Sequence, residues 1–394
     1  MSAALATERP NLPALTSLRF LAAVHVVAFH LQAIDVAFAS GPFADFVSIG
    51  YIGVHFFFVL SGFIMVYNYA GRPVAKPRFW RARFARVYPA YAFSLLITAP
   101  IFAIAITKPE FAFFRFAADH TLITCLAVVG LLQAWIPDAA LSWNPVSWSL
   151  SVEAFFYLLF PFLLPWFLDR GRRGLLLVIG GCWLFIMAVP SAYVILEPDG
   201  LAETGPRVFL ATWLNVVKFN PLVRLPEFFV GMATGLLFLR RGNDDRLGTP
   251  LIVITLIGIL AFTLVSPVIP YPFQHNGTLA PLFGLLVYGM ALRPSWTRFL
   301  EVRPLVLLGD SSYSLYLFHA TFLPLLFLNP DGTPREADPL DLAFAVLFCF
   351  GIAVLIFRFL EVPARRRLGP RRAKPPEAAA APETAPEPNG EGAR

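Results

Sequence analysis

Two side chains that can carry charge, Arg19 and His30, lie within the first long apolar stretch of the chain, residues 12–34. They are eleven residues apart, which at about 100° per residue returns to nearly the same helix face. A rise of about 1.5 Å per residue separates them along that face by roughly 16 Å. Ionisable groups are costly in lipid, so they usually face a protein interior or a wet cavity and mark a functional site. The alternative for His30 is an interfacial ring that reaches the lipid headgroups.

Three more polar side chains are predicted at a similar depth in the membrane, namely His55, Glu153 and His319. Imidazole titrates near neutral pH and a hydrogen-bonded carboxylate fixes its tautomer, so such a layer can supply a general base with an orienting partner. The alternatives are structural roles. Glu153 could form an ion pair with an arginine such as Arg19, and the two histidines could hydrogen-bond a neighbouring helix.

A basic segment, RPVAKPRFWRARFARVYP, leads into the third apolar stretch. Within it, Arg83 and Arg86 are spaced i and i+3 at the start of a helix, so both guanidinium groups share one face at the membrane surface. Guanidinium groups suit phosphates, so we expect this pair to meet a phosphate-rich cytoplasmic donor. For Arg72, Lys76 and Arg78, the favoured interpretation is orientation of the helix by the positive-inside rule.

Several other residues that could do chemistry are better explained by packing. Ser61 and Gly62 lie in mid-membrane, where small residues permit close helix approach. A nucleophilic role for Ser61 is not favoured, because no G-x-S-x-G elbow surrounds it. The cysteines Cys125, Cys182 and Cys349 are widely spaced within apolar stretches, so they predict neither a disulfide framework nor a metal site. His25, His120 and His275 are likewise interpreted as structural residues, because nothing around them in the sequence suggests a site.

The composition is that of an integral membrane protein, with 57% hydrophobic and 14% charged residues and a mean hydropathy of +0.67. The apolar stretches predict one all-α membrane domain, residues 12–362. Residues 1–11 lack a signal-peptide pattern and are expected to be a short cytoplasmic N-terminus before a retained helix. The net charge of +6 resides mostly in arginine clusters beside the membrane. It therefore indicates contact with the lipid bilayer and not with nucleic acid.

Ten apolar stretches are long enough, or nearly so, to cross a bilayer as helices. They cover residues 12–34, 47–69, 84–107, 145–168, 174–195, 225–239, 250–266, 278–292, 304–328 and 340–361. An eleventh stretch, residues 122–137, is short. If it does not cross, all five arginine clusters fall on the cytoplasmic side with the N-terminus, so we predict a re-entrant or interfacial segment. The clusters lie within residues 72–86, 170–173, 240–246, 293–298 and 365–367. Residues 363–394, rich in Pro, Ala and Glu, predict a disordered cytoplasmic tail.

Five segments resemble, in this order and at these intervals, the acyltransferase 3 family of bacterial membrane O-acyltransferases. They are LTSLRFLAAVHVVAFH, GVHFFFVLSGFIM, RFWRARFARVYPAY, SWSLSVEAFFYLLFP and LGDSSYSLYLFHATFL. Arg19 and His30 match the arginine and histidine of the family's first helix. Arg83 and Arg86 fall in its basic motif, and Glu153 matches the acidic residue of its fourth span.

The resemblance implies a ten-helix bundle in the bacterial cytoplasmic membrane. Such a bundle takes an acyl group, commonly acetyl, from cytoplasmic acyl-CoA and transfers it to a hydroxyl, usually on a sugar, at the opposite face. The acceptor is therefore expected to be an extracytoplasmic glycan or a glycosylated small molecule. Acyl-CoA is a donor substrate, and neither a tightly bound cofactor nor a metal is expected.

Within this family resemblance, we expect His30 to act as general base. Glu153 would orient this histidine or a charged partner, and Arg19 would either hold Glu153 or stabilise developing negative charge. His55 departs from the family pattern, in which many relatives carry an acidic or small residue. A continuous cavity through the first four spans should connect His30 with Arg83 and Arg86. Direct transfer and a covalent relay both fit. The alternative functions are a proton-coupled transporter that uses the buried charges and a membrane scaffold without chemistry.

Overall fold

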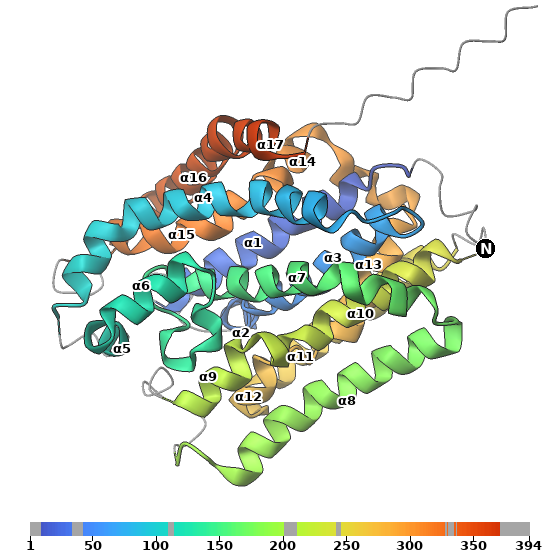
Figure 1. Cartoon of the computed structure of the whole chain (residues 1–394), viewed down its shortest axis with the longest axis horizontal. Helices are drawn as coiled ribbons and strands as arrows, with labels where there is room; N and C mark the ends of the chain where they lie inside the picture. Colours follow the sequence, from blue (N-terminus) through green and yellow to red (C-terminus); the bar gives the residue numbers. More distant parts are fainter. Residues whose placement is uncertain are drawn as a thin grey trace, which may run out of the picture.

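The computed structural model describes residues 9–33, 42–108, 114–200, 211–241, 246–327, 329, 335 and 337–370. These residues form helices joined by turns, and no strand occurs among them. The α-helices are α1 (Pro13–Ala33), α2 (Pro42–Ser48), α3 (Ile52–Tyr69), α4 (Lys76–Ala105), α5 (Arg115–Asp119), α6 (Thr121–Val129), α7 (Trp148–Leu168), α8 (Arg172–Leu196), α9 (Thr212–Phe219), α10 (Pro221–Leu239), α11 (Gly248–Val265), α12 (Tyr271–Gln274), α13 (Ala280–Ala291), α14 (Arg303–Asp310), α15 (Ser312–Phe327), α16 (Pro339–Ile356) and α17 (Val362–Leu368). The long helices run side by side as one bundle (Figure 1).

Eight helical segments of the described residues are long and apolar enough to cross a membrane, and they contain α1, α3, α4, α7, α8, α10, α11 and α16. The two remaining predicted spans coincide with α13 and α15, which have 12 and 16 residues. At about 1.5 Å per residue these two helices measure roughly 18 and 24 Å, less than the roughly 30 Å hydrocarbon core of a bilayer. Every predicted stretch thus contains at least one helix, eight of them long enough to cross a membrane and two of them shorter. The protein is a multi-pass, all-α membrane protein.

One predicted span, residues 304–328, is two helices and not one. Ser311 separates α14 from α15. Just before the break, α14 packs closely against α1, because a Cβ on Gly309 would stand 2.0 Å from the carbonyl oxygen of Thr16. The backbone of α14 thus lies directly on the backbone of α1.

The predicted tail also begins differently from the expectation. Its first residues continue the last helix, because α17 ends at Leu368. Residues 371–394 lie outside the described part of the chain, as do residues 1–8. The prediction of a disordered tail therefore concerns residues that the structure does not describe, apart from this helical start.

The segment predicted to be re-entrant or interfacial, residues 122–137, does not cross the bundle. Its helix α6 has nine residues, which at about 1.5 Å each span roughly 13 Å. The helix stops at Gly130, and Leu131 follows with a positive φ of 56°. Short 3₁₀ turns then lead toward α7. This agrees with the expectation of a non-crossing segment.

The centre of the bundle is the contact between α3 and α10, which glycines make possible. A Cβ on Gly62 would lie 2.2 Å from the carbonyl oxygen of Phe228, and one on Gly231 would lie 1.9 Å from that of Val59. No side chain fits at either position. The close approach predicted for Gly62 is therefore confirmed, and it brings the polar residues of α3 next to those of α7 and α10.

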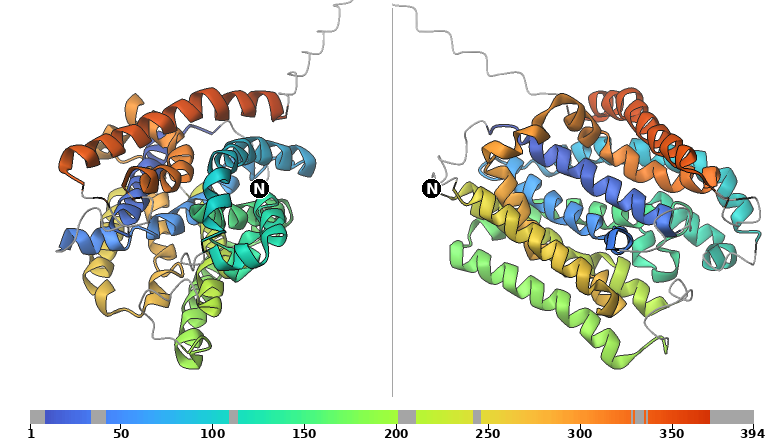
Figure 2. Two further views of the ribbon diagram at one scale, coloured as in Figure 1. Left: turned by 90° about the vertical axis from the view of Figure 1, so that its left-hand side faces the viewer. Right: turned by 180° about the vertical axis from the view of Figure 1, so that it is seen from behind.

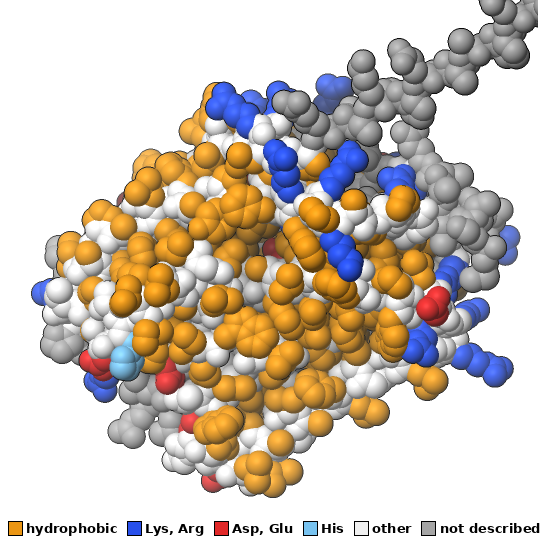
Figure 3. Space-filling model, viewed as in Figure 1, with side chains coloured by type: hydrophobic (Ala, Val, Ile, Leu, Met, Phe, Trp, Pro, Cys, Tyr) orange, Lys and Arg blue, Asp and Glu red, His pale blue; other side chains and the backbone are white. Residues whose placement is uncertain are grey.

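The outer helices carry the apolar surface that a membrane protein turns to lipid. Helix α8 lies at one edge of the bundle and α16 at the opposite edge (Figures 1 and 2). Only 17% of the apolar window is buried in each of them, and Leu177, Leu184 and Ile195 of α8 are at least 65% exposed. Figure 3 shows this apolar surface around the middle of the molecule. The polar groups of the bundle are consequently on its inside.

Basic side chains gather at one end of the bundle, here called the basic end and defined by Arg9, Arg170, Arg240 and Arg293. Figure 1 places the start of α1, the turn from α3 to α4 and the turn from α7 to α8 at this end, and Figure 3 shows its Lys and Arg side chains. The guanidinium of Arg240 donates hydrogen bonds to the carbonyls of Leu168 and Arg170, which caps the end of α7. The opposite end, with α2, α6, α9 and α12, is called the distal end.

Candidate active site

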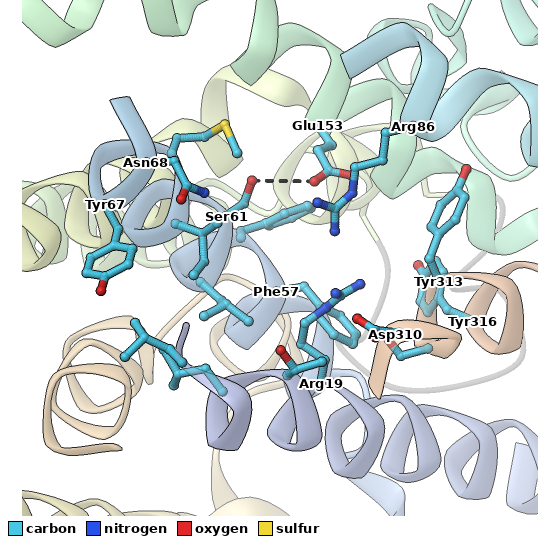
Figure 4. Close-up of a pocket in the computed structure, with 18 of the residues that line it drawn as sticks. Arg19, Phe57, Ser61, Tyr67, Asn68, Arg86, Glu153, Asp310, Tyr313 and Tyr316 are labelled. Atoms are coloured by element: carbon cyan, nitrogen blue, oxygen red, sulfur yellow. Dashed lines mark hydrogen bonds between the residues drawn. The ribbon is translucent and has the colours of Figure 1, made fainter. Parts of the chain in front are cut away.

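A cavity of about 340 Å³ extends into the bundle from the basic end. Its lining begins with the exposed Asn11 and Asn68 and reaches Val54, in the first turn of α3, and Tyr316 of α15. Side chains of α1, α3, α4 and α7 form much of the wall, as predicted for the first four spans. Helices α14, α15 and α17 close the remaining side, and Figure 4 shows the polar groups that meet in the space.

Arg19 of α1 and Arg86 of α4 both point into this cavity (Figure 4). Neither forms a hydrogen bond or an ion pair within the described part of the chain. The charge of Arg19 does interact with that of Arg86 and with the carboxylate of Asp310, which lies beside Arg19. Two guanidinium groups with all donors uncommitted, in a partly dry space, are suited to bind an anion.

Arg83 does not share this position. Its guanidinium lies 5.8 Å from the ring centre of Phe79 and 5.7 Å from that of Tyr157, with Met65 Sδ 3.9 Å from one nitrogen. It is absent from the cavity lining. Arg83 and Arg86 were expected to face one space, and in this structure they do not. They are three residues apart on α4, and the side chain of Arg83 packs against α3 and α7 while that of Arg86 enters the cavity.

Glu153 lies on the cavity wall but not beside a histidine. Its carboxylate accepts hydrogen bonds from the hydroxyl of Tyr157, one turn further along α7, and from Ser61 Oγ of α3 at 3.4 Å. Within the described residues it makes no hydrogen bond or ion pair with Arg19 or His30, the two partners that the sequence suggested. The network fixes a carboxylate at the wall of the cavity between α3 and α7.

His30 instead contacts a second histidine. Its Nδ1 lies 2.8 Å from the carbonyl oxygen of Val26 and 3.2 Å from Nε2 of His319. Nδ1 of His319 lies 3.2 Å from the carbonyl oxygen of Leu315. Carbonyl oxygens only accept, so both Nδ1 atoms carry the proton, and the single Nδ1–H of His30 is shared between the carbonyl of Val26 and Nε2 of His319. That leaves Nε2 of His30 with a free lone pair, which is the form a general base needs.

The cavity does not extend to this histidine pair, contrary to the expected continuous path. Phe57 and Tyr316 line its inner end, with ring centres 6.1 Å apart. Tyr316 also lies 6.0 Å from the ring of His319, one turn further along α15. Its hydroxyl is held by Ser149 at 2.7 Å and by the carbonyl of Val146 at 2.9 Å. One aromatic layer therefore separates the arginines from the histidines.

His55 belongs to a different group of polar residues nearer the distal end. It is 2% exposed, and its Nδ1 has no hydrogen-bond partner among the residues described. Beside it, Arg224 and Glu227 of α10 form an ion pair of 3.0 Å with both side chains fully buried. Arg224 also donates to the carbonyl of His275 at 2.6 Å, whose ring stacks on Tyr51. This cluster, which the sequence did not predict, joins α3, α10 and the segment after α12.

Sequence reasoning also missed several cavity residues, namely Asp310, Tyr157, Tyr313, Tyr316 and Arg365. Asp310, Tyr313 and Tyr316 lie in the quoted segment LGDSSYSLYLFHATFL, so the signal for them was present in the motif itself. Tyr157 follows Glu153 at a spacing of four, which places both on one helix face. No such signal exists for Arg365, because its position in a run of three arginines predicts only a basic cluster at the membrane surface.

The geometry thus defines a class of protein: a multi-pass helical membrane protein with an arginine- and tyrosine-lined cavity next to a histidine pair, in which His319 is buried and His30 is half-buried. Comparison with known families is more specific. The family model Acyl_transf_3, described as an acyltransferase domain, matches residues 12–358. The chain therefore belongs to this family and is a membrane acyltransferase, as its five motifs suggested.

Individual relatives agree with this assignment. The acyltransferase MdmB of Streptomyces mycarofaciens is 29% identical over 385 residues, which is 92% of this chain and 94% of that protein. The O-acetyltransferase OatA of Staphylococcus aureus is 24% identical over 90% of this chain. The peptidoglycan O-acetyltransferase OatA of Listeria monocytogenes is 25% identical over 91%. The chain covers 57% and 56% of these two OatA proteins. No solved structure matches the chain.

Proposed function

We propose that the protein is an O-acyltransferase that moves an acetyl group from acetyl-CoA to a hydroxyl of a glycan or of a glycosylated small molecule. The observation that carries the proposal is the cavity, which places the uncommitted guanidinium groups of Arg19 and Arg86 on a path from the basic end toward the His30–His319 pair. Relatives whose names specify O-acetyl transfer, one of them to peptidoglycan, support both the group transferred and a carbohydrate acceptor.

In this proposal the donor enters from the basic end. Its phosphates stay near the mouth of the cavity, where the cations are, and its pantetheine arm extends inward past Glu153 and the tyrosines. The positive-inside rule supports a cytoplasmic location of the basic end in a bacterial inner membrane, with the acceptor at the distal end. Both chain termini then lie in the cytoplasm.

The reaction joins the two halves of the site. Nε2 of His30 takes the proton of the acceptor hydroxyl while its oxygen attacks the thioester carbonyl, forming the new C–O bond. Once Phe57 and Tyr316 have moved aside, Arg19 extends from the cavity wall to the oxyanion and stabilises it, because its donors are uncommitted within the described residues. Collapse of the intermediate breaks the C–S bond, and the proton on His30 goes to the CoA thiolate. His319 holds the ring of His30 in the required tautomer.

For this step the acyl carbon must reach His30, so Phe57 and Tyr316 must move aside when the donor binds. Phe57 packs against three separate groups of core residues, and Tyr316 is held by two hydrogen bonds. Gating by side chains of this kind keeps water from the thioester until the pantetheine arm fills the space.

The test is transfer of radiolabel from acetyl-CoA by the full-length protein in membrane vesicles with the basic end accessible. We expect label in a glycan or small-molecule fraction, and loss of that label in Arg86→Gln at matched protein level. Arg172→Gln, at the start of α8 and outside the cavity lining, is the control for lost surface charge. Solute uptake coupled to protons without consumption of acyl-CoA would instead support the transporter.

A further inference from the structure

The last membrane helix changes its geometry before it ends. Helix α16 passes into a π-helix at Phe357–Glu361, and α17 follows without a break. A π-helical turn inserts an extra residue and so shifts the face that later residues present, and such turns often occur at functional sites. Here the shift turns Glu361 inward, to 1% exposure, at the end of a helix whose apolar window is only 17% buried.

The Glu361 carboxylate is held on both oxygens. Oε1 accepts from Ser314 Oγ of α15, and Oε2 forms an ion pair with Arg365, one turn further along. A buried carboxylate needs such partners, because an unpaired charge in this environment is very costly. The pairing also fixes the direction of Arg365, the first of three consecutive arginines.

Arg365 differs from the two arginines that follow it. Its side chain is 32% exposed and lines the cavity, whereas Arg366 and Arg367 are fully outside it and exposed. Its Nε is buried and has no hydrogen-bond partner within the described residues. One terminal nitrogen of its guanidinium is thus paired with Glu361, while the Nε–H has no acceptor among the described residues.

The charge of the cavity is unbalanced where Arg365 enters it. The lining contains four arginines, Arg9, Arg19, Arg86 and Arg365, against the two carboxylates of Glu153 and Asp310, and the arginines still outnumber the carboxylates when Glu361 behind the lining is added. Arg365 and Arg86 come from opposite ends of the sequence, and their charges interact across the cavity. Like charges in a partly dry space repel one another unless an anion lies between them.

We propose that Arg365 binds a phosphate group of the nucleotide part of the donor together with Arg86, and that Glu361 positions it. The inference rests on the proposed use of acyl-CoA and adds a second binding residue that belongs to α17. Arg365 takes the place that the sequence suggested for Arg83, whose guanidinium is packed among Phe79, Tyr157 and Met65. A guanidinium fork fits the oxygens of a phosphate better than an ammonium group does.

The experiment compares two donors with purified full-length protein in proteoliposomes: acetyl-CoA, and acetyl-pantetheine, which lacks the nucleotide and its phosphates. Loss of one charge-assisted contact predicts that Arg365→Gln raises KM for acetyl-CoA about 10- to 100-fold. Its kcat should change little, and its kcat/KM for acetyl-pantetheine should equal that of wild type. Arg366→Gln, with the same loss of charge one residue away, should behave as wild type with both donors.

Two further variants keep the test decisive. Arg365→Lys retains the charge and should raise KM for acetyl-CoA less than Arg365→Gln does, even if the glutamine variant folds poorly. Glu361→Gln should raise KM for acetyl-CoA and leave acetyl-pantetheine unaffected, because it acts through Arg365.

The inference is overturned if Arg365→Gln leaves KM for acetyl-CoA unchanged, or weakens both donors equally, which indicates a structural role. An equal effect of Arg366→Gln also overturns it, since that result points to surface charge or to lipid headgroup phosphates. If wild type uses no acetyl-CoA at all, the proposed function fails first and the inference fails with it. The last result is distinct from the other three, because only it abolishes wild-type transfer.

Discussion

Nε2 of His319 lies 3.2 Å from Nδ1 of His30, so α15 and α1 meet at a pair of imidazoles. The carbonyl of Val26 and the carbonyl of Leu315 fix both Nδ1 atoms as donors. The pair therefore has a direction: His319 accepts from His30, and the lone pair on Nε2 of His30 is available to a substrate. The following prediction tests this arrangement.

Removing the acceptor on His319 should slow the reaction without weakening donor binding. In His319→Phe, Nδ1 of His30 loses a partner and the ring loses one of its two restraints, so we expect kcat to fall about 10- to 100-fold with KM for acetyl-CoA unchanged. His319→Gln keeps an acceptor and should recover part of the activity. Initial rates with varied acetyl-CoA give both constants. Equal loss in the two variants would mean that His319 only fills space.

The contact between Glu153 and Tyr157 should act as a unit. Because the Tyr157 hydroxyl donates to the carboxylate, Glu153→Gln and Tyr157→Phe each disturb the same network. We expect both to lower the transfer rate, and the double variant to be no worse than the poorer single one, with a coupling energy of about 0.5–3 kcal/mol. Tyr157→Phe combined with Glu301→Gln, a distant pair, should be additive. Additive effects of the Glu153 and Tyr157 changes would show that the two residues act separately.

Adding one methyl group between α3 and α10 should destabilise the bundle. In Gly231→Ala the new Cβ would meet the Val59 carbonyl at 1.9 Å, so the helices must separate at a cost of about 1–3 kcal/mol or more. Gly180→Ala on α8 is the matched control, because nothing lies within 4 Å of its added Cβ. Thermal unfolding in detergent measures both. A Gly231→Ala protein as stable as Gly180→Ala would contradict the close packing of these helices.

The buried ion pair near the distal end should be needed for stability. Glu227→Gln leaves the guanidinium of Arg224 buried without its counter-charge, which typically costs about 3–5 kcal/mol. Glu301→Gln removes the partner of Arg293 in an ion pair of 2.7 Å at the basic end, where Arg293 is 45% exposed. Such surface pairs contribute about 0–1 kcal/mol. Similar losses of unfolding free energy in the two variants would show that Arg224 is not isolated from water.

The helices could be predicted well from the sequence because the hydrophobic pattern alone determines them. Each of the ten stretches contains a helix, although residues 304–328 form two, and the five arginine clusters correctly excluded residues 122–137 from the spans. The ends were less predictable. Ser311 splits one span next to the contact of Gly309 with Thr16, and that contact joins residues almost 300 positions apart.

The site was predictable only where a motif named the residue. Arg19, Arg86 and Glu153 do lie on one cavity, but periodicity alone could not show that Arg83 turns away or that Glu153 pairs with Tyr157 and not with a histidine. Arg365 is the clearest case. Its inward direction depends on a π-helical turn and on the hydrogen bond between Glu361 and Ser314. Neither feature can be predicted from the composition or from the spacing of residues.

The central claim is that His30 is the base for acetyl transfer. The most direct measurement compares transfer of label from acetyl-CoA by wild type, His30→Ala and His120→Ala in the same vesicles at matched protein level. His120 is exposed and outside the cavity, so its variant controls for loss of a histidine as such. We predict full transfer by His120→Ala and a loss of at least about 100-fold by His30→Ala. Equal transfer by His30→Ala and wild type would contradict the account.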